Sequence, residues 1–343
     1  MEEVSVIGID LAKNVFELSA KSAAGALTWR KRLKRAAFMR FMEEKAPRCL
    51  VAFEACGGAH YWGRWLLARG FKVKLMAPRL VKPYRLGQHK DDARDADACA
   101  EAGSRARVPA IRVKSESAQA LQALVRIRTR RIRQVVQTAN QLRSVLYEFG
   151  IVVPKGHRRM LEAIAGVMSS LPAEIAGMVE GLCGELSEQM RAVKATSEDL
   201  LKCIKHEESC QRLMTIPNLG PINAASLSVA LEAPGEFANG RAFAACLGLV
   251  PRHAQSAERQ ALLGIAKQCA NETRRHLVLA AQSLFNRLNR MKELPQDRFL
   301  LWAHALLKRK NRNVAAVAVA AKLARIAWAV AAKEQVYIPR LPA

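Results

Sequence analysis

The sequence reads Lys90-Asp91-Asp92-Ala93-Arg94-Asp95-Ala96-Asp97-Ala98 at the start of a predicted helix. Asp92 and Asp95 are three residues apart, which puts both side chains on one helical face with Cβ atoms roughly 5–6 Å apart. Two carboxylates that close repel each other unless a cation lies between them. Asp91 and Asp95 would also share a face, so the spacing alone allows either Asp91 or Asp92 as the partner of Asp95. The same pattern is typical of a solvated helix start, where Asp suits the positive end of the dipole.

Two more acids stand at the ends of predicted strands upstream of this helix. Val4 to Asp10 is an apolar run rich in β-branched residues, and Cys49 to Phe53 predicts a buried strand with Glu54 at its end. The whole segment predicts three strands, a helix, a strand, a helix, a strand and then the acidic helix. Ligands of such α/β sheets gather at the carboxyl ends of the strands. We therefore expect both strand-end acids to meet the acidic pair of the helix.

Four carboxylates at one site predict a metal centre. The candidate ligands are Asp10, Glu54, Asp92 and Asp95. Carboxylate oxygens suit a hard cation such as Mg²⁺, and the set could hold one or two ions. A pair of such ions can clamp the attacking and leaving oxygens of a phosphodiester. Without further information, the sequence supports a Mg²⁺-dependent nucleic-acid enzyme.

Composition points to the same class of substrate. The 343 residues include 55 Lys and Arg against 30 Asp and Glu, a formal net charge of +25. Nucleic acid is therefore the first expected partner and a membrane surface the second. No signal peptide is visible, and the apolar run from Val314 to Ala321 is too short to span a bilayer. The eight cysteines form no C-x-x-C pair, which is typical of reduced, mostly buried thiols in a cytoplasmic protein.

Three blocks of the sequence resemble a known family. Gly8-Ile9-Asp10, followed by a turn and an alternating strand, is similar to the opening of RNase H-like nucleases. The blocks at 53–62 (F-E-A-C-G-G-A-H-Y-W) and 90–96 (K-D-D-A-R-D-A) resemble the DEDD transposases of the insertion-sequence-110 type, especially the branch named for insertion sequence 1111. The resemblance implies that the tetrad is Asp10, Glu54, Asp92 and Asp95, with Asp92 chosen over Asp91.

The resemblance also implies an α/β + α fold. Residues 1–110 would form an RNase H-like DEDD metal domain that carries a long helical, coiled-coil-like insertion at 111–206. Residues 207–343 would form a mostly helical transposase domain. Within the insertion, the stretch from Ser115 to Phe149 has no Gly or Pro and predicts one long helix with a coiled-coil-like seam.

Five arginines lie within eight residues of that long helix: Arg126, Arg128, Arg130, Arg131 and Arg133. A charge run is often only a solvated helix face. In a chain this basic, an arginine-rich helix is expected to track the phosphates of a nucleic acid. The same stretch could also belong to a dimer seam, and the two roles are compatible.

The carboxyl-terminal half carries two further signals. The stretch 213–225 predicts two helices that meet at a tight turn containing Gly220, which resembles a helix-hairpin-helix whose amides contact phosphate without reading sequence. The stretch 243–252, ending in Arg252, resembles a transposase block of the family. A few residues on, the family's nucleophilic serine falls on Ser256, which would hold DNA as a covalent phosphoserine ester. The chain departs from the family at Ala257-Glu258-Arg259, where the family has Gly-Gly-Lys.

We interpret the sequence as a transposase of a bacterial insertion element, acting in the cytoplasm at the nucleoid. Family resemblance implies a structured element-encoded guide RNA that pairs with DNA. We also expect a homo-oligomer, either a dimer or a tetramer, and no membrane partner. The nearest alternative is a junction-resolving nuclease in which water replaces Ser256. An actin-like or sugar-kinase ATPase would need a second phosphate loop, and none appears after residue 110. A purely structural nucleic-acid-binding protein would not need four placed acids.

Overall fold

The computed structural model describes residues 3–85, 91–256, 259–265, 272–293 and 295–341, with the backbone alone at 252–256 and 259–262. The chain divides into two compact units, Met1–Glu116 and Ser117–Ala343. The first boundary lies close to residue 110. The predicted helical region 111–206 mostly shares the second unit with the residues that follow it, and the three-part division of the sequence stays a prediction.

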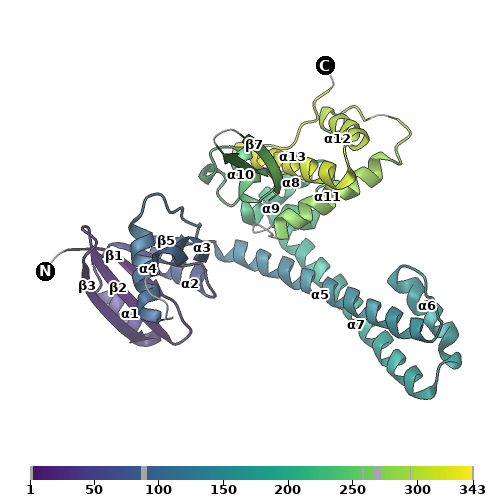
Figure 1. Cartoon of the computed structure of the whole chain (residues 1–343), viewed down its shortest axis with the longest axis horizontal. Coiled ribbons are helices and arrows are strands. Elements are labelled where there is room, and N and C mark those ends of the chain that lie inside the picture. Colours follow the sequence, from purple (N-terminus) through teal and green to yellow (C-terminus); the bar gives the residue numbers. More distant parts are fainter. Residues whose placement is uncertain (1–2, 86–90, 257–258, 266–271, 294, 342–343) are drawn as a thin grey trace. The chain divides into compact units, whose positions relative to one another are not determined.

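The first unit is built on a five-stranded sheet (Figure 1). Its strands are β1 (Val4–Asp10), β2 (Val15–Ser22), β3 (Leu27–Lys34), β4 (Leu50–Glu54) and β5 (Lys72–Met76). The order across the sheet is β3-β2-β1-β4-β5. β1, β2 and β3 are antiparallel neighbours, whereas β4 pairs parallel with both β1 and β5. The sequence predicted each strand, because apolar β-branched runs are separated there by turn residues.

Helices cover both faces of this sheet. They are α1 (Arg35–Glu44), α2 (Ala59–Leu67), α3 (Pro78–Val81) and α4 (Asp92–Ser104). α1 and α2 bury one face through a cluster of aromatic rings, in which Phe16 stacks on Phe38 and meets the edge of Trp62. α4 covers the other face with small side chains. The acidic helix therefore lies on its own side of the sheet.

The long helices belong to the second unit. They are α5 (Glu116–Glu148), α6 (His157–Val167) and α7 (Ala173–Lys205). α5 and α7 lie side by side (Figure 1), and the α5 residues Val135, Ala139 and Leu142 are buried in one cluster with Leu186 of α7. The predicted coiled-coil-like seam is therefore covered by a helix of the same chain, at least along this part of α5.

The remaining helices form the core of the second unit. They are α8 (Glu208–Met214), α9 (Pro221–Ala230), α10 (Gly240–Cys246), α11 (Glu272–Leu288), α12 (Arg298–Arg309) and α13 (Arg312–Lys333). A two-stranded antiparallel hairpin, β6 (Pro251–Ser256) and β7 (Arg259–Ile265), interrupts them. This hairpin was not predicted from the sequence, because polar residues dominate its first strand and no apolar alternation marks it.

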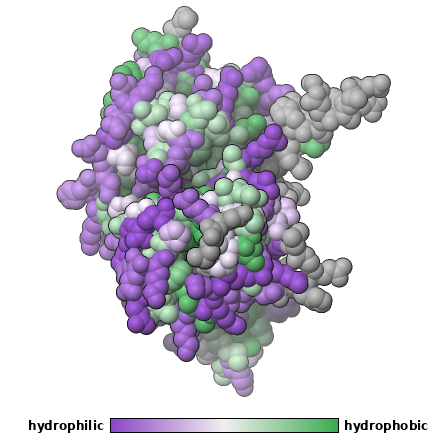
Figure 2. Space-filling model, turned by 90° about the vertical axis from the view of Figure 1, so that its left-hand side faces the viewer, coloured by the Kyte–Doolittle hydropathy of each residue, from purple (hydrophilic) through white to green (hydrophobic). Residues whose placement is uncertain are grey.

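α13 is the one helix in the described residues that is long and apolar enough to cross a membrane by length and composition. Its residues Ala316, Ala320 and Leu323 are fully buried in the core of the second unit, and core helices pass the same test. The face of the molecule in Figure 2 is mainly hydrophilic, with smaller hydrophobic areas between the polar side chains.

The expectation of mostly buried cysteines is wrong for the described part of the chain. Cys99 and Cys210 are buried, but Cys56, Cys203 and Cys246 are exposed. These exposed thiols lie in the β4–α2 loop, in α7 and at the end of α10, respectively.

Candidate functional site

Strand geometry brings the two strand-end acids together. Successive side chains of a strand point to opposite faces of the sheet. Gly8 faces α4, so Asp10 faces α4 as well. β1 and β4 are parallel, with Ile9 opposite Phe53, and Asp10 and Glu54 are the next residues in that register. Both carboxylates therefore lie at the carboxyl edge of the sheet, on the face that α4 covers.

Glycine allows α4 to approach this face very closely. A Cβ atom on Gly8 would overlap the backbone of Ala96 and Ala100 in α4. Likewise, a Cβ atom on Gly103 would overlap the side chain of Ala52 in β4. Without these Cβ atoms, the helix rests almost directly on the strands. This contact places the first turn of α4, with its acids, beside the end of β1.

The aspartates at the start of α4 have different partners. Asp91 is the N-cap, and its carboxylate accepts a hydrogen bond from the backbone of the second residue beyond it at 3.1 Å. Asp97 forms an ion pair with an arginine of β3. Asp92 is exposed and Asp95 is buried, and both raise the pKa of Asp10. The capping role of Asp91 supports Asp92 as the third acid, as the family resemblance implies.

The carboxyl group of Asp10 is difficult to ionise. Its pKa is raised from 3.8 to about 6, chiefly by burial and then by the charges of Asp95, Asp92 and Glu54, in that order. Like charges disfavour ionisation only when they are close. The four predicted ligands are therefore near enough to one another to form one electrostatic site.

Arg85 lies among these acids, although the sequence did not predict it as a site residue. Its Nη2 donates a hydrogen bond to Glu54 Oε1 at 2.8 Å, and its Nε lies 3.0 Å from Asp95 Oδ1. The guanidinium thus bridges two predicted metal ligands and lowers the pKa of Asp10. In a chain with 55 Lys and Arg, one arginine after β5 carries no sequence signal of its own.

The donor chemistry of this site fits a hard divalent cation, since every predicted ligand is a carboxylate. As placed, however, no three acidic, His or Cys side chains among the described residues converge closely enough to hold a metal ion. Arg85 provides the positive charge between Glu54 and Asp95 instead. Metal binding at this site would therefore require Arg85 to leave at least one of these carboxylates.

Ser256 is the last residue of β6, and its backbone lies opposite Arg259 in the hairpin. Arg252 belongs to the same strand. The side chains of both residues, and the positions Ala257 and Glu258, lie outside what the structure describes. The predicted roles of Ser256 and Arg252 stay predictions.

The five arginines of α5 divide into two groups. Arg126, Arg130 and Arg133 are exposed, at a spacing of four and three residues that keeps them on one helical face. Arg128 and Arg131 turn toward α7: the first donates to Ser197 at 2.8 Å, and the second donates to the Ala192 carbonyl at 2.9 Å and to Thr196. Three of the five predicted phosphate contacts therefore lie on a solvent-facing surface, while the other two help to join α5 to α7.

The predicted helix-hairpin-helix consists of α8, the turn at 215–220 and α9. Gly220 is the N-cap residue of α9, and a Cβ atom there would meet open space within the described residues. The left-handed residue of the turn is Asn218, with φ of 65°. Gly220 therefore leaves room beside the first amides of α9, but the chain conformation does not require glycine at this position.

Comparisons with known proteins identify the class. A family model of the DEDD transposases of IS110 matches residues 7–151, and the model of the IS116/IS110/IS902 transposase family matches residues 210–296. A probable family 20 transposase of Pseudomonas aeruginosa is 36% identical over 98% of this chain and 99% of its own length. The transposase for insertion sequence element IS1328 of Yersinia enterocolitica is 35% identical over the same shares of the two chains. The class is that of insertion-element transposases, which are DNA-transfer enzymes.

The branch follows from a further relative. The transposase for insertion sequence element IS1111A of Coxiella burnetii is 32% identical over 98% of this chain and 92% of that protein. This chain belongs to the IS110 family of DEDD transposases, in the branch that includes IS1111. The resemblance noted in the sequence is confirmed.

Proposed function

We propose that this transposase cleaves and exchanges DNA strands with Mg²⁺ bound by Asp10, Glu54, Asp92 and Asp95. The observation that carries the proposal is the electrostatic coupling of Asp10 to the other three acids at the carboxyl edge of the sheet. The mixed five-stranded sheet, with acids after β1 and β4, supports the RNase H-like fold that the family resemblance implies.

Each group of residues has a separate task in this proposal. The four carboxylates hold one or two metal ions, whose charge, when bound, favours attack on a phosphodiester. The exposed arginines Arg126, Arg130 and Arg133 hold the nucleic-acid backbone and carry no sequence information. Sequence is then read by an element-encoded guide RNA that pairs with donor and target DNA.

Ser256 is the proposed nucleophile. Its hydroxyl oxygen forms an ester bond to the scissile phosphorus, while the bond from that phosphorus to the leaving DNA oxygen breaks. The serine proton passes to a base, and the leaving strand takes up a proton at its new hydroxyl group. A serine is a weak nucleophile without such activation, and the tetrad is the proposed source of it.

A search for a protein–DNA adduct tests this step. A stalled reaction should yield an adduct that survives denaturant and maps to Ser256 by mass spectrometry. Ser256→Ala should lose both adduct and recombination while still binding DNA, whereas Ser104→Ala, at an exposed serine of α4, should retain both. Normal cleavage by Ser256→Ala, with no adduct in the unchanged protein, would instead support the junction-resolving nuclease that uses water.

The alternative rests on a specific departure. Glu258 stands where the family has glycine, and a negative charge beside a phosphate opposes its approach. A water nucleophile would need the tetrad but not the β6–β7 hairpin.

The last part of the proposal concerns the partners of the protein. We propose that the protein works in the bacterial cytoplasm, at the nucleoid, as a dimer or tetramer bound to DNA and to its guide RNA. Sequencing the RNA that copurifies with the protein tests the RNA partner. Recovery of RNA unrelated to the DNA flanking the gene would contradict it.

A further inference from the structure

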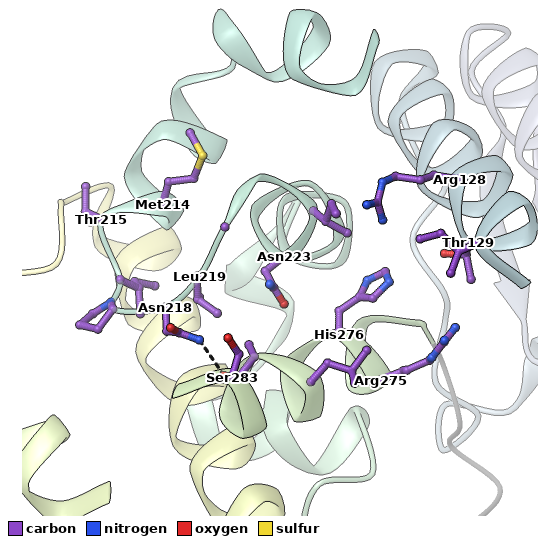
Figure 3. A pocket seen from close by; sticks show the side chains of 17 residues that line it. Arg128, Thr129, Met214, Thr215, Asn218, Leu219, Asn223, Arg275, His276 and Ser283 are labelled. Carbon is purple, nitrogen blue, oxygen red and sulfur yellow. Dashed lines mark hydrogen bonds between the residues drawn. The ribbon is translucent and has the colours of Figure 1, made fainter. Parts of the chain in front are cut away.

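A cavity of 690 Å³ lies in the second unit between α5, the α8–α9 turn and α11 (Figure 3). Ligand sites in proteins usually span about 300–1,000 Å³, so this cavity has the size of a small-molecule site. The roles proposed above leave it without an occupant. It joins two features that the sequence marked separately, namely the arginine-rich helix and the predicted hairpin turn.

The cavity is preformed, because its hairpin wall is tied to α11. Asn218 adopts the left-handed conformation, with φ of 65°, and its Nδ2 donates to the Ala280 carbonyl at 2.7 Å. Figure 3 shows this hydrogen bond beside the cavity. On the opposite side, Arg128 is fixed by its Nε–H, which donates to Ser197 at 2.8 Å. In a preformed site, few side chains have to be ordered when a ligand binds, so the entropic cost of binding is small.

The charge of the lining favours an anion. Arg128 extends from α5 and Arg275 from α11, and none of the described lining residues is acidic. Ser197 accepts from the Nε of Arg128, and no hydrogen bond within the described residues occupies the two terminal nitrogens of that guanidinium, which can therefore contact a ligand. Arginine presents such nitrogens in a geometry that matches phosphate oxygens.

The rest of the lining favours a flat group with polar edges. Ile132, Leu219 and Ile222 supply apolar wall, and the imidazole of His276 extends into the same space. His276 Nδ1 and the Ser226 hydroxyl are hydrogen-bonded at 2.8 Å, and burial lowers the pKa of His276, which favours the neutral ring. The side-chain oxygen of Asn223 has no hydrogen-bond partner among the described residues. A nucleobase offers apolar faces, and N–H groups on its edge can donate hydrogen bonds to such an oxygen.

We propose that this cavity binds a single unpaired nucleotide of the nucleic-acid partner, with its phosphate at Arg128 and Arg275 and its base between the apolar wall and His276. The inference rests on the proposed function, which supplies the nucleic-acid partner. Extruded bases are held by other nucleic-acid proteins through the same combination of stacking and edge contacts. In this proposal the cavity binds one unpaired nucleotide of the strand, whereas the exposed arginines of α5 bind the backbone of the strand.

Binding of mononucleotides to the full-length protein tests the proposal. The four deoxynucleoside 5′-monophosphates should bind saturably in calorimetry, at least about tenfold more tightly than deoxyribose 5-phosphate or inorganic phosphate, because base stacking contributes. Arg275→Gln should weaken this binding by about tenfold, the loss of one charge-assisted hydrogen bond. Arg287→Gln is the matched control, since Arg287 is an exposed arginine of the same helix outside the cavity lining, and it should change nothing.

A second variant tests occupancy of the cavity directly. Ser283 is an exposed lining residue of α11, so Ser283→Trp can fill the mouth without a core mutation. It should abolish mononucleotide binding at an unchanged melting temperature. Equal binding of inorganic phosphate and mononucleotides, or undiminished binding by Ser283→Trp, would overturn the proposal. So would equally tight binding of a polyglutamate peptide.

The same samples separate this inference from the proposed function. Binding of a 30-nucleotide DNA without mononucleotide binding would overturn the cavity assignment alone. Failure to bind either ligand would overturn the nucleic-acid function on which it rests.

Discussion

The acidic site of the first unit and the arginine-rich helix of the second assemble in opposite ways. Asp10, Glu54 and Asp95 are far apart in the sequence, yet the charges of Glu54 and Asp95 raise the pKa of Asp10 at the edge of the sheet. Arg126 and Arg128 are almost adjacent in the sequence, yet one faces solvent and the other packs on α7. Closeness in the sequence is therefore a weaker indication of shared function than the face of the helix or strand on which the side chains lie.

Removal of a tetrad acid should give the largest effect that separates the two regions. Asp10→Asn should lower the rate of DNA cleavage roughly 1000-fold or more, because metal ions contribute several kcal/mol to transition-state stabilisation. Affinity for DNA, measured by fluorescence anisotropy, should stay within about twofold, since the basic surface of the second unit is unchanged. Full activity in Asp10→Asn would remove the tetrad from the mechanism.

Replacement of the exposed arginines should give the reverse result. With Arg126, Arg130 and Arg133 changed to Gln, DNA affinity near 0.1 M salt should fall roughly 100-fold or more. The slope of log affinity against log salt should become shallower by roughly three units, one for each phosphate contact. Arg131→Gln is the control, because its side chain bonds α7, and it should leave the slope unchanged. An unchanged slope in the triple variant would assign this face to assembly.

Arg85 is a basic residue that forms ion pairs within the acidic site of the first unit. Arg85 pairs with Glu54 and Asp95 and would compete with a metal ion for them, so Arg85→Ala should tighten Mg²⁺ binding about tenfold, equivalent to roughly 1.4 kcal/mol. Calorimetry measures this without any turnover. Arg105→Ala removes an arginine that pairs with Glu101 at the other end of α4, and it should have no effect. Weaker Mg²⁺ binding by Arg85→Ala would show that Arg85 holds the ligands in place for the metal.

The smallest expected effect concerns pH. Asp10 has a pKa of about 6 in the folded protein against 3.8 in the unfolded chain, so the folded state binds this proton more tightly. In EDTA, its contribution to stability is full below about pH 4 and is lost as pH rises through about 6. The melting temperature of Asp10→Asn should therefore gain a few degrees on that of the unchanged protein between pH 5 and 7. A constant difference across this range would contradict the burial and repulsion assigned to Asp10.

The sheet and its strand-end acids could be predicted because alternation and turn residues are local signals. The long helix of α5 was equally predictable, since no Gly or Pro interrupts it. Arg85, the exposure of individual arginines and the cavity could not be predicted, because each depends on which element packs against another. Asp91 illustrates the limit: its spacing matches that of a metal ligand, but its carboxylate caps α4 instead.

The β6–β7 hairpin shows the same limit from another direction. Its pairing depends on backbone hydrogen bonds between two strands, and the residues from Arg252 to Ser256 carry no apolar face to signal it. The family resemblance alone makes Ser256 a candidate nucleophile, because residue patterns by themselves indicate only a polar segment there.

The contact of Gly8 with α4 restricts which residues around the acid site can be substituted during evolution. At Gly8, the strand and the helix approach each other backbone to backbone, with no side chain of residue 8 between them. Most residues on the outer surface of α4 can therefore be substituted without altering the separation of the acids. Position 8 has no such freedom, because a single methyl group would act as a wedge that lifts Asp92 and Asp95 away from Asp10 and Glu54.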